Sequence, residues 1–232
     1  MPDSETTPTH LKRFMFPRWA NLLAPVSGLG VVGGLLYATT LFAFGASPKT
    51  MGVGYAPDQP VRYSHALHAG KLGLDCRYCH NTVERTPFAS LPPTQTCMNC
   101  HTKIWNTSEF IKPIQDSWST GKPIEWIKIH NLPNYVYFNH SAHVNHGVGC
   151  IECHGRIDRM DVVYQFAPLS MGWCLECHRA PESHLRPRDV RITDMDWKPP
   201  QGEEGVALGQ ELRREYQLRD TQYMTSCSTC HR

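Results

Sequence analysis

Residues 76–80 read Cys-Arg-Tyr-Cys-His, and this spacing of two cysteines and a histidine returns four more times along the chain. Two thiols at positions i and i+3 lie on one helical turn, where both can bond the vinyl groups of a single porphyrin. The histidine that follows is then placed beneath the porphyrin iron. The pattern therefore predicts five covalently attached haems of the c type. The predicted attachment points are Cys76, Cys79, Cys97, Cys100, Cys150, Cys153, Cys174, Cys177, Cys227 and Cys230.

Each motif also supplies the proximal ligand of its own haem iron. Paired C-x-x-C sequences can instead build Cys₄ zinc sites, which is the main alternative. A histidine after every one of the five pairs favours haem. Because all ten cysteines are used in this way, no thiol remains for a disulfide. The predicted proximal ligands are His80, His101, His154, His178 and His231.

Two six-residue blocks with the pattern aromatic-x-His-x-x-His precede two of the motifs. The first histidine block, residues 63–68, reads Tyr-Ser-His-Ala-Leu-His, and the second histidine block, residues 138–143, reads Phe-Asn-His-Ser-Ala-His. Each block is followed by two C-x-x-C-H motifs. Self-similarity at a fixed separation predicts a duplicated structural unit. We therefore expect a di-haem unit at about 60–101, a linker at 102–136, a second di-haem unit at about 137–180 and a terminal haem at 223–232.

The histidine blocks also predict ligands for the opposite face of each iron. Histidines three residues apart can bind the irons of two closely packed haems. For the fifth iron we favour His130, just before the second unit, with Met171 as the alternative. We expect His146 and His184 to lie on the surface or to contact iron ligands without binding iron themselves. His10 precedes a long apolar segment. The predicted distal ligands are His65, His68, His130, His140 and His143.

Two protein ligands on every iron would leave no position for a substrate. Enzymatic haems keep such a position open, whereas saturated haems exchange single electrons. The sequence contains neither a serine-hydrolase elbow nor a glycine-rich phosphate loop. Its 23 basic and 21 acidic residues include no basic run interleaved with aromatic residues, so nucleic acid is not an expected partner. The sequence thus predicts an electron carrier without catalytic residues of its own.

Haem would also supply most of the apolar interior of this 232-residue chain. Porphyrin surface replaces side-chain surface, so long amphipathic helices and patterned strands are not required. The 18 prolines and 17 glycines agree with a loop-rich chain. We expect a multihaem cytochrome c fold, with mostly short α-helices and loops wrapped around five covalently attached haems and one N-terminal transmembrane helix. A mixed-charge helix is also expected around residues 211–218.

The segment between Arg18 and Lys49 contains no charged residue. A helix over residues 23–46 is long enough to cross a bilayer core of about 30 Å. The basic residues Lys12, Arg13 and Arg18 lie before it. The sequence therefore predicts a membrane anchor.

The charge distribution predicts the orientation of this anchor. The positive-inside rule keeps residues 1–22 in the cytoplasm and places residues 47–232 on the outer, periplasmic side, where c-type haem is attached. We expect a single-pass protein of the inner membrane. The alternative is a cleaved signal peptide with residues 43–45, Ala-Phe-Gly, at the cleavage site. Gly30 and Gly34 stand in G-x-x-x-G spacing, which favours close packing against other membrane subunits.

Six stretches around the motifs carry a more specific pattern. They are residues 62–65, 76–81, 92–101, 137–140, 169–179 and 227–231. Together they resemble the pentahaem cytochrome c subunit of bacterial alternative complex III. The resemblance implies an electron-transfer subunit of a quinol:electron-acceptor oxidoreductase. It also implies partner subunits: multi-span membrane proteins that oxidise quinol, a large iron–sulfur subunit and a mono-haem cytochrome c. A soluble cytochrome c or a blue-copper protein would accept the electrons.

Two other functions stay open at this point. The chain could be a self-sufficient, membrane-anchored multihaem quinol dehydrogenase, with the anchor forming part of a quinol site. It could also be a multihaem reductase with one open haem, which requires that neither His130 nor Met171 binds iron.

Overall fold

The computed structural model describes residues 16–231, apart from the side chains of residues 48 and 49. The chain divides into two units, Met1–Thr50 and Met51–Arg232. Three residues used in the predictions above lie outside the described residues: His10, Lys12 and Arg13. The orientation of the anchor therefore stays a prediction.

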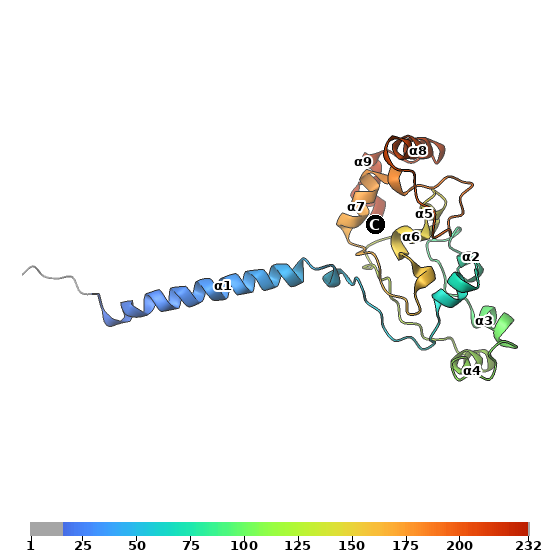
Figure 1. The fold of residues 1–232 in the computed structure, drawn as a ribbon, viewed down its shortest axis with the longest axis horizontal. Helices are drawn as coiled ribbons and strands as arrows, with labels where there is room; N and C mark the ends of the chain where they lie inside the picture. The colour runs from blue at the N-terminus through green and yellow to red at the C-terminus, as the bar shows by residue number, and fades with distance from the viewer. Residues whose placement is uncertain (1–15, 232) are drawn as a thin grey trace, which may run out of the picture. The chain divides into compact units, whose positions relative to one another are not determined.

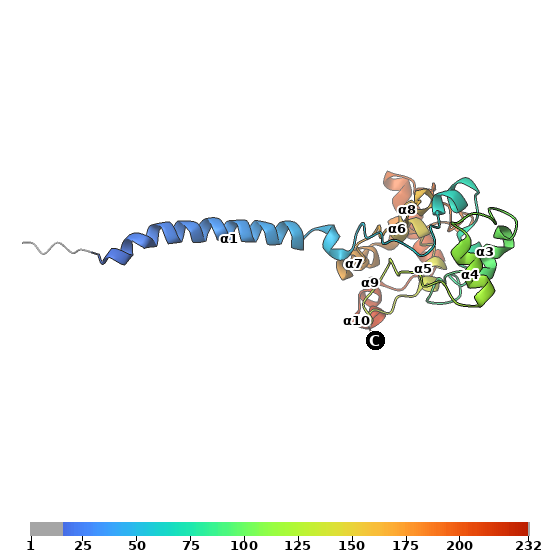
Figure 2. The same cartoon turned by 90° about the horizontal axis from the view of Figure 1, so that it is seen from below.

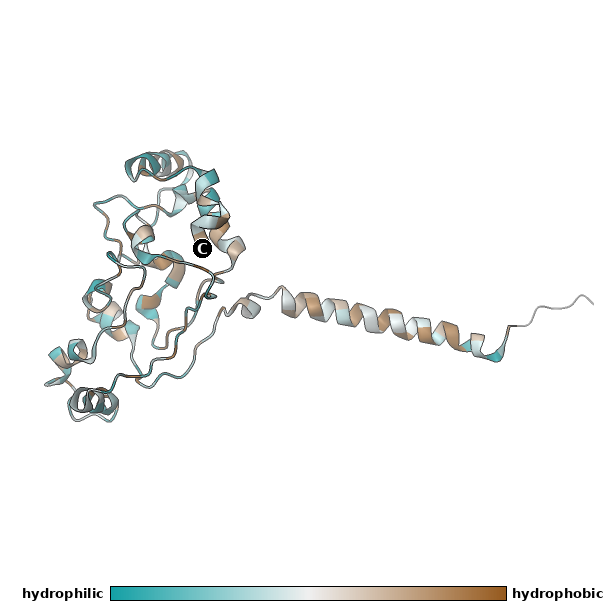
Figure 3. Cartoon of the chain, turned by 180° about the vertical axis from the view of Figure 1, so that it is seen from behind, coloured by the Kyte–Doolittle hydropathy of each residue, from teal (hydrophilic) through white to brown (hydrophobic). Residues whose placement is uncertain are grey.

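The first unit contains one long apolar helix. A 3₁₀ turn at Arg18–Leu22 leads into α1, Leu23–Gly45, whose 23 residues span about 35 Å. Most residues of α1 are apolar, as the hydropathy colours in Figure 3 show, and their side chains are exposed. The hydroxyl of Thr39 donates to the backbone carbonyls of Leu35 and Leu36, both at 2.9 Å, so it needs no solvent. Within residues 16–231, this is the one helix long and apolar enough to cross a membrane.

The second unit consists of short helices joined by loops, with no β-strand among its described residues (Figures 1 and 2). An isolated β-bridge joins Val148 and Leu185. The longest helix of this unit has only 14 residues, which agrees with the predicted helix-and-loop fold. The elements after α1 are η2 Pro48–Met51, η3 Ala66–Lys71, α2 Cys76–Cys79, α3 Thr94–His101, α4 Lys112–Thr120, α5 His140–Val144, α6 Cys150–His154, η4 Ile157–Arg159, α7 Met171–Arg179, η5 Pro181–His184, α8 Gly202–Glu215, α9 Thr221–Met224 and α10 Cys227–Cys230.

Among residues 16–231, buried apolar side chains form two small clusters. One cluster packs α3 against α4, and the other packs α8 against the loop that follows η5. A side-chain core of this size is small for a unit of this length, as expected for a chain that surrounds prosthetic groups. The clusters consist of Val61, Met98, Ile111 and Ile114, and of Leu185, Leu212 and Tyr216.

The helix expected around residues 211–218 begins earlier, at the first residue of α8, and ends before Tyr216. Glu203 and Glu204 lie in its first turn, where negative charge interacts favourably with the helix dipole. Gln217 has a φ of 52°, a left-handed conformation that stops the helix. A mixed-charge helix was predicted in this region, but its start was wrong by nine residues and its end by three.

The two histidine blocks continue into different kinds of helical turn. The first runs into η3, which is π-helical, whereas the second lies on α5, an ordinary α-helix. His68 and Cys76 are eight positions apart, but His143 and Cys150 are seven positions apart. A π-turn holds one residue more than an α-turn. The π-turn therefore accommodates the one extra residue that separates the histidine block from its C-x-x-C-H motif in the first repeat.

Candidate haem-binding sites

Both cysteines of every C-x-x-C-H motif lie on the same short helix. The five helices are α2, α3, α6, α7 and α10. Asp75 caps α2 by accepting a hydrogen bond of 2.9 Å from the amide of Arg77. Ser170 caps α7 in the same way, accepting from the amide of Trp173 at 3.2 Å. Each thiol pair therefore has the i, i+3 placement that the motif predicts.

None of the ten cysteines forms a disulfide, and eight of them are partly buried. Burial raises the pKa of Cys153 to about 12 and that of Cys177 to about 11. Burial of this kind favours an uncharged sulfur, such as that of a thioether, over a charged thiolate. A Cys₄ zinc site needs four ligands that converge, and residues 16–231 hold no group of three or more potential metal ligands.

Four of the five proximal histidines have their Nδ1–H bonded to a backbone carbonyl. A histidine that donates from Nδ1 keeps its Nε2 lone pair for a metal, which is the usual arrangement of an iron-binding imidazole. His154 is the exception, because its Nδ1 is buried without a hydrogen-bond partner in the described structure. The four bonds run from His80 to Ser90 at 2.9 Å, from His101 to Ile104 at 2.9 Å, from His178 to Met224 at 2.8 Å and from His231 to Tyr135 at 3.0 Å.

Three of the predicted distal histidines show the same arrangement. Their Nδ1 atoms donate to backbone carbonyls, so that Nε2 is again free to bind iron. His65 differs, because its Nδ1 is buried and has no hydrogen-bond partner among the described residues. The three bonds run from His68 to Ser64 at 2.9 Å, from His140 to Pro87 at 2.8 Å and from His143 to Asn139 at 2.8 Å.

Two of the predicted distal histidines lie near predicted proximal histidines, at the ring separation that an iron between them requires. The ring centroids of His68 and His101 lie 6.2 Å apart, and those of His143 and His178 lie 6.1 Å apart. An iron held between two imidazoles by metal–nitrogen bonds of about 2.0 Å places the centroids about 6 Å apart. These two pairs therefore fit six-coordinate haem.

The geometry of the first histidine block is reproduced in the second. Tyr63 stacks on His68 with 4.3 Å between centroids, and Phe138 stacks on His143 with 4.6 Å. The same two aromatic rings meet the first histidine of each block edge-on, at interplanar angles of 84° and 85°. The repeat seen in the sequence is therefore also a repeat of side-chain geometry.

Each histidine block packs against the other repeat, which the sequence did not predict. The amide of Ala66, after His65, donates to the carbonyl of Met160 at 3.0 Å. The amide of Ser141, which occupies the same place in the second block, donates to the carbonyl of Thr86 at 3.3 Å. Both acceptors lie six residues after a proximal histidine. The two repeats thus exchange equivalent contacts, and no feature of the spacing signals this.

No family model matches the chain. A curated relative, the multihaem cytochrome c subunit of the menaquinone reductase of Nitratidesulfovibrio vulgaris, is 30% identical over 151 residues, which cover 55% of this chain and 70% of that protein. The chain belongs to the family of this multihaem cytochrome c subunit. The family implies c-type haem as the cofactor, in agreement with the histidine geometry. The number of five haems stays a prediction from the motif count.

Several histidines of this multihaem cytochrome c are buried near one another in the second unit. Burial, with nearby His80, lowers the pKa of His65 to about 4. Burial also lowers the pKa of His154 to about 3, with His130 and His140 as further causes. These imidazoles are therefore neutral near pH 7, which is the form that binds iron.

The terminal motif is held by the segment before the second histidine block. The amide of Tyr137 donates to the carbonyl of Cys230 at 2.8 Å, and the ring of Tyr135 lies 5.8 Å from that of His231. Met171 opens α7 and is 67% exposed. Cys174, one turn further along α7, has its pKa raised by burial and by nearby Cys230. Met171 thus belongs to a helix beside the terminal C-x-x-C-H motif.

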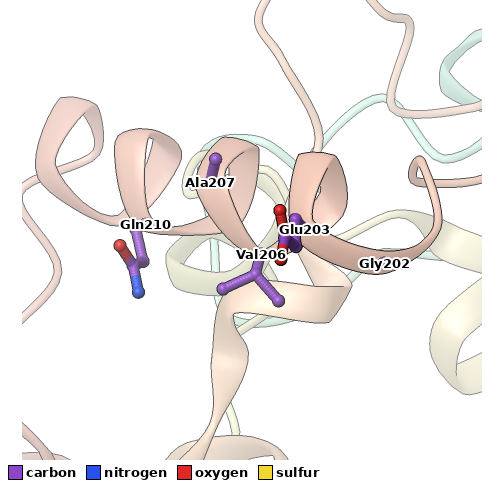
Figure 4. A pocket seen from close by; sticks show the side chains of 5 residues that line it. All are labelled: Gly202, Glu203, Val206, Ala207 and Gln210. Atoms are coloured by element: carbon purple, nitrogen blue, oxygen red, sulfur yellow. The ribbon is translucent and has the colours of Figure 1, made fainter.

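Two of the histidines that were not predicted as ligands, His146 and His184, contact other side chains. The ring of His146 lies 6.4 Å from that of Tyr216, and Nδ1 of His184 lies 2.7 Å from a carboxylate oxygen of Glu152. The open pocket in Figure 4 lies on α8, and Glu203 is the single titratable side chain among the residues that line it. This pocket carries no catalytic arrangement.

Proposed function

We propose that this chain is the electron-transfer subunit of a membrane quinol:electron-acceptor oxidoreductase of the alternative complex III type. It relays electrons through five c-type haems to a periplasmic acceptor, such as a cytochrome c or a blue-copper protein. The observation that carries the proposal is the pair of histidine couples, His68 with His101 and His143 with His178, at iron-binding separation in a repeated frame. Haem iron supplies reversible one-electron exchange when it is bound.

The proposed role of the protein side chains is to saturate the irons and to exclude substrate. His68 and His143 cap the haems of α3 and α7. His65 and His140, which lie near His80 and His154, supply distal ligands for the haems of α2 and α6. With both axial positions taken, a haem binds no substrate, so a relay is favoured over a reductase.

The distal ligand of the terminal haem is left to His130 or Met171. Met171 is favoured by its exposure and by its place on α7, three residues before a cysteine that lies near Cys230. A thioether ligand would raise the reduction potential of this haem above that of bis-histidine haems. The terminal haem would then be a favourable point for electrons to collect.

We also propose that α1 is retained as a single-pass anchor, with residues 1–22 in the cytoplasm and residues 47–232 in the periplasm. An apolar helix with exposed side chains supports membrane insertion. The relative is named as a subunit of a menaquinone reductase, which supports a quinone-linked complex here. The proposed partners are multi-span membrane subunits, an iron–sulfur subunit and a mono-haem cytochrome c.

The experiment is purification of the natively produced protein from detergent-solubilised membranes. Every co-purifying chain is identified, and haem per chain is measured as the pyridine haemochrome. We expect five haem equivalents and co-purification with the proposed partner subunits. Recovery of this chain alone with quinol-oxidising activity would favour the self-sufficient dehydrogenase. Carbon monoxide binding to one reduced haem of the unmodified protein would favour the reductase.

A further inference from the structure

We propose that Arg186, a buried cation, raises the reduction potential of the haem attached to α6 through its positive charge. The proposal rests on haem binding as proposed above, but it does not depend on the identity of the surrounding complex.

Arg186 lies against the backbone that leads into the α6 motif. A Cβ built on Gly149 would stand only 2.4 Å from Cζ of Arg186, so the guanidinium occupies the place of a side chain there. Cys150, the next residue, is the first predicted attachment point of this haem. Contact with Cys76 and burial raise the pKa of the Cys150 thiol, and the charge of Arg186 opposes this rise. The cation therefore acts on the atom that would bond the porphyrin.

One loop holds the guanidinium and the start of α6 together. Nη1 of Arg186 donates to the backbone carbonyls of Arg191 at 3.2 Å and of Asp194 at 2.6 Å. Between these two residues, the carbonyl of Ile192 accepts from the amide of Cys150 at 3.3 Å. The position of the charge relative to the first cysteine is therefore fixed by backbone hydrogen bonds.

The charge of Arg186 is only partly offset by the protein. Its Nε and Nη2 are buried without a hydrogen-bond partner among the described residues. None of the ion pairs formed by the described residues includes it. Arg186 helps to lower the pKa of Asp194, but that carboxylate is held mainly by the amide of Asp196. A guanidinium does not lose its proton in a protein, so the positive charge persists.

Protein atoms alone cover Arg186, which is 1% exposed. A carboxylate of the haem therefore has no open route to the guanidinium, and we expect no neutralisation from that side. Water is excluded as well, and a charge without water around it acts more strongly on its neighbours.

A positive charge near a haem favours its reduced state. Reduction adds one electron to ferric iron and lowers the positive charge of the haem by one, so a nearby cation stabilises the product. At an effective dielectric constant of about 20, a unit charge within about 10 Å changes such an equilibrium roughly tenfold. A tenfold change corresponds to about 59 mV for one electron. Loss of Arg186 should therefore lower the potential of the α6 haem by about this amount.

The test uses three variants of the full-length chain, each produced in its own membrane and purified with its partners. Arg186→Gln removes the charge and keeps an amide donor for the loop carbonyls. Arg188→Gln is the matched control, because Arg188 is 62% exposed and pairs with Glu215 at 2.6 Å. Asp194→Asn removes the carboxylate near Arg186 and keeps an oxygen that can accept from the amide of Asp196. Haem per chain is measured first, and a potentiometric titration followed by optical and electron paramagnetic resonance spectra then gives the potential of each haem.

We expect Arg186→Gln to lower the potential of one haem about tenfold in its equilibrium, and Arg188→Gln to leave all five unchanged. Asp194→Asn should raise the potential of the same haem by a smaller amount. Arg186→Gln and Asp194→Asn both disturb the same loop, so a purely structural effect would not reverse its sign between them. Unchanged potentials in a fully loaded Arg186→Gln protein, or equal shifts in Arg186→Gln and Arg188→Gln, would overturn the proposal.

The experiment stays decisive if Arg186→Gln does not load five haems. Asp194→Asn then carries the test, because a half-buried residue on the loop is replaced by one of the same shape. A rise in the potential of one haem supports the proposal, whereas no change or a fall overturns it. A failure of the proposed function would appear separately, in the haem count and partner subunits of the unmodified protein.

Discussion

The guanidinium of Arg186 stacks on the ring of Trp197, with 5.1 Å between Cζ and the ring centroid. Gly149 lies against the guanidinium as well, because a Cβ at this glycine would stand only 2.3 Å from Nε of Arg186. Arg186 is 1% exposed, and its Nη1 donates to the carbonyl of Asp194 at 2.6 Å. A buried cation therefore packs against the residue that precedes Cys150, the first cysteine of the α6 motif.

The contact between Gly149 and Arg186 predicts a loss of stability in Gly149→Ala. Gly149 has a φ of −69°, so an added methyl group causes no backbone strain, and its effect comes from the clash alone. Overpacking of this kind typically costs about 1–3 kcal/mol. Gly172→Ala is the control, because the nearest atom to its Cβ is Ser170 Oγ at 4.0 Å. Thermal unfolding of the haem-loaded proteins measures both, and equal melting temperatures would contradict the prediction.

The capping carboxylate of α2 predicts an acid-dependent stability. Asp75 accepts from the amide and guanidinium of Arg77 and from the hydroxyl of Thr193, and mainly the guanidinium lowers its pKa to about 2. Because the folded-state pKa lies below the ordinary value of about 3.9, the stabilisation is complete above about pH 4. It is lost as the pH falls towards 2. Asp75→Ala should cost about 1 kcal/mol at pH 7 and weaken this acid dependence.

Asp116→Ala provides the matched control for Asp75→Ala. Asp116 pairs with Lys112 on the surface of α4, and both side chains are 60% exposed. Such pairs contribute roughly 0.3–0.5 kcal/mol. Denaturant unfolding at pH 7 and pH 3 should separate the two variants. An equal loss of stability in both would contradict the cap assignment.

A buried hydroxyl links α8 to the chain segment behind α6. Tyr216 donates to the backbone carbonyl of Arg186 at 2.8 Å, and its side chain is buried. Tyr216→Phe keeps the ring but leaves this carbonyl without the donor, which should cost about 1 kcal/mol. Tyr223→Phe, at a half-exposed tyrosine, should have little effect. Denaturant unfolding monitored by haem absorbance measures both variants, and a Tyr216→Phe protein as stable as the parent would contradict the prediction.

The histidine couples predict which substitutions open a haem. His68→Ala and His143→Ala should each convert one haem to a high-spin form that binds carbon monoxide after reduction, because each removes one axial ligand. His146→Ala is the control, since this histidine continues the second block by three residues and faces Tyr216. Optical and electron paramagnetic resonance spectra measure the outcome. A fully low-spin His68→Ala protein would contradict the proposal that His68 and His101 bind the same iron.

The exchanged contacts between the repeats predict that the first di-haem unit is not independent. The amide of Ser141 bonds to the carbonyl of Thr86, and that of Ala66 bonds to the carbonyl of Met160. A chain that ends at residue 136 loses both contacts. We expect it to accumulate with fewer than two haems, in comparison with the full-length chain, when haem per chain is measured. Stable loading with two low-spin haems would show that the repeat folds alone.

The sequence predicts arrangements of residues that lie close together along the chain. The cysteine pairs are three residues apart, so a single helical turn sets the distance between their thiols whatever the rest of the chain does. The stacking of Tyr63 on His68 is likewise set within six residues, and it returns in the second block. The long uncharged segment predicted α1 because helix length and bilayer thickness are both known.

The tertiary structure alone decided which distant residues meet. His68 lies opposite His101 and His130 touches His154 through loops without periodicity, so sequence separation carries no information about these contacts. The buried position of Arg186 was also not visible, because an arginine in a polar loop ordinarily remains in solvent. Covalent spacing predicts where haem is attached, whereas packing between the repeats decided which histidines lie close together.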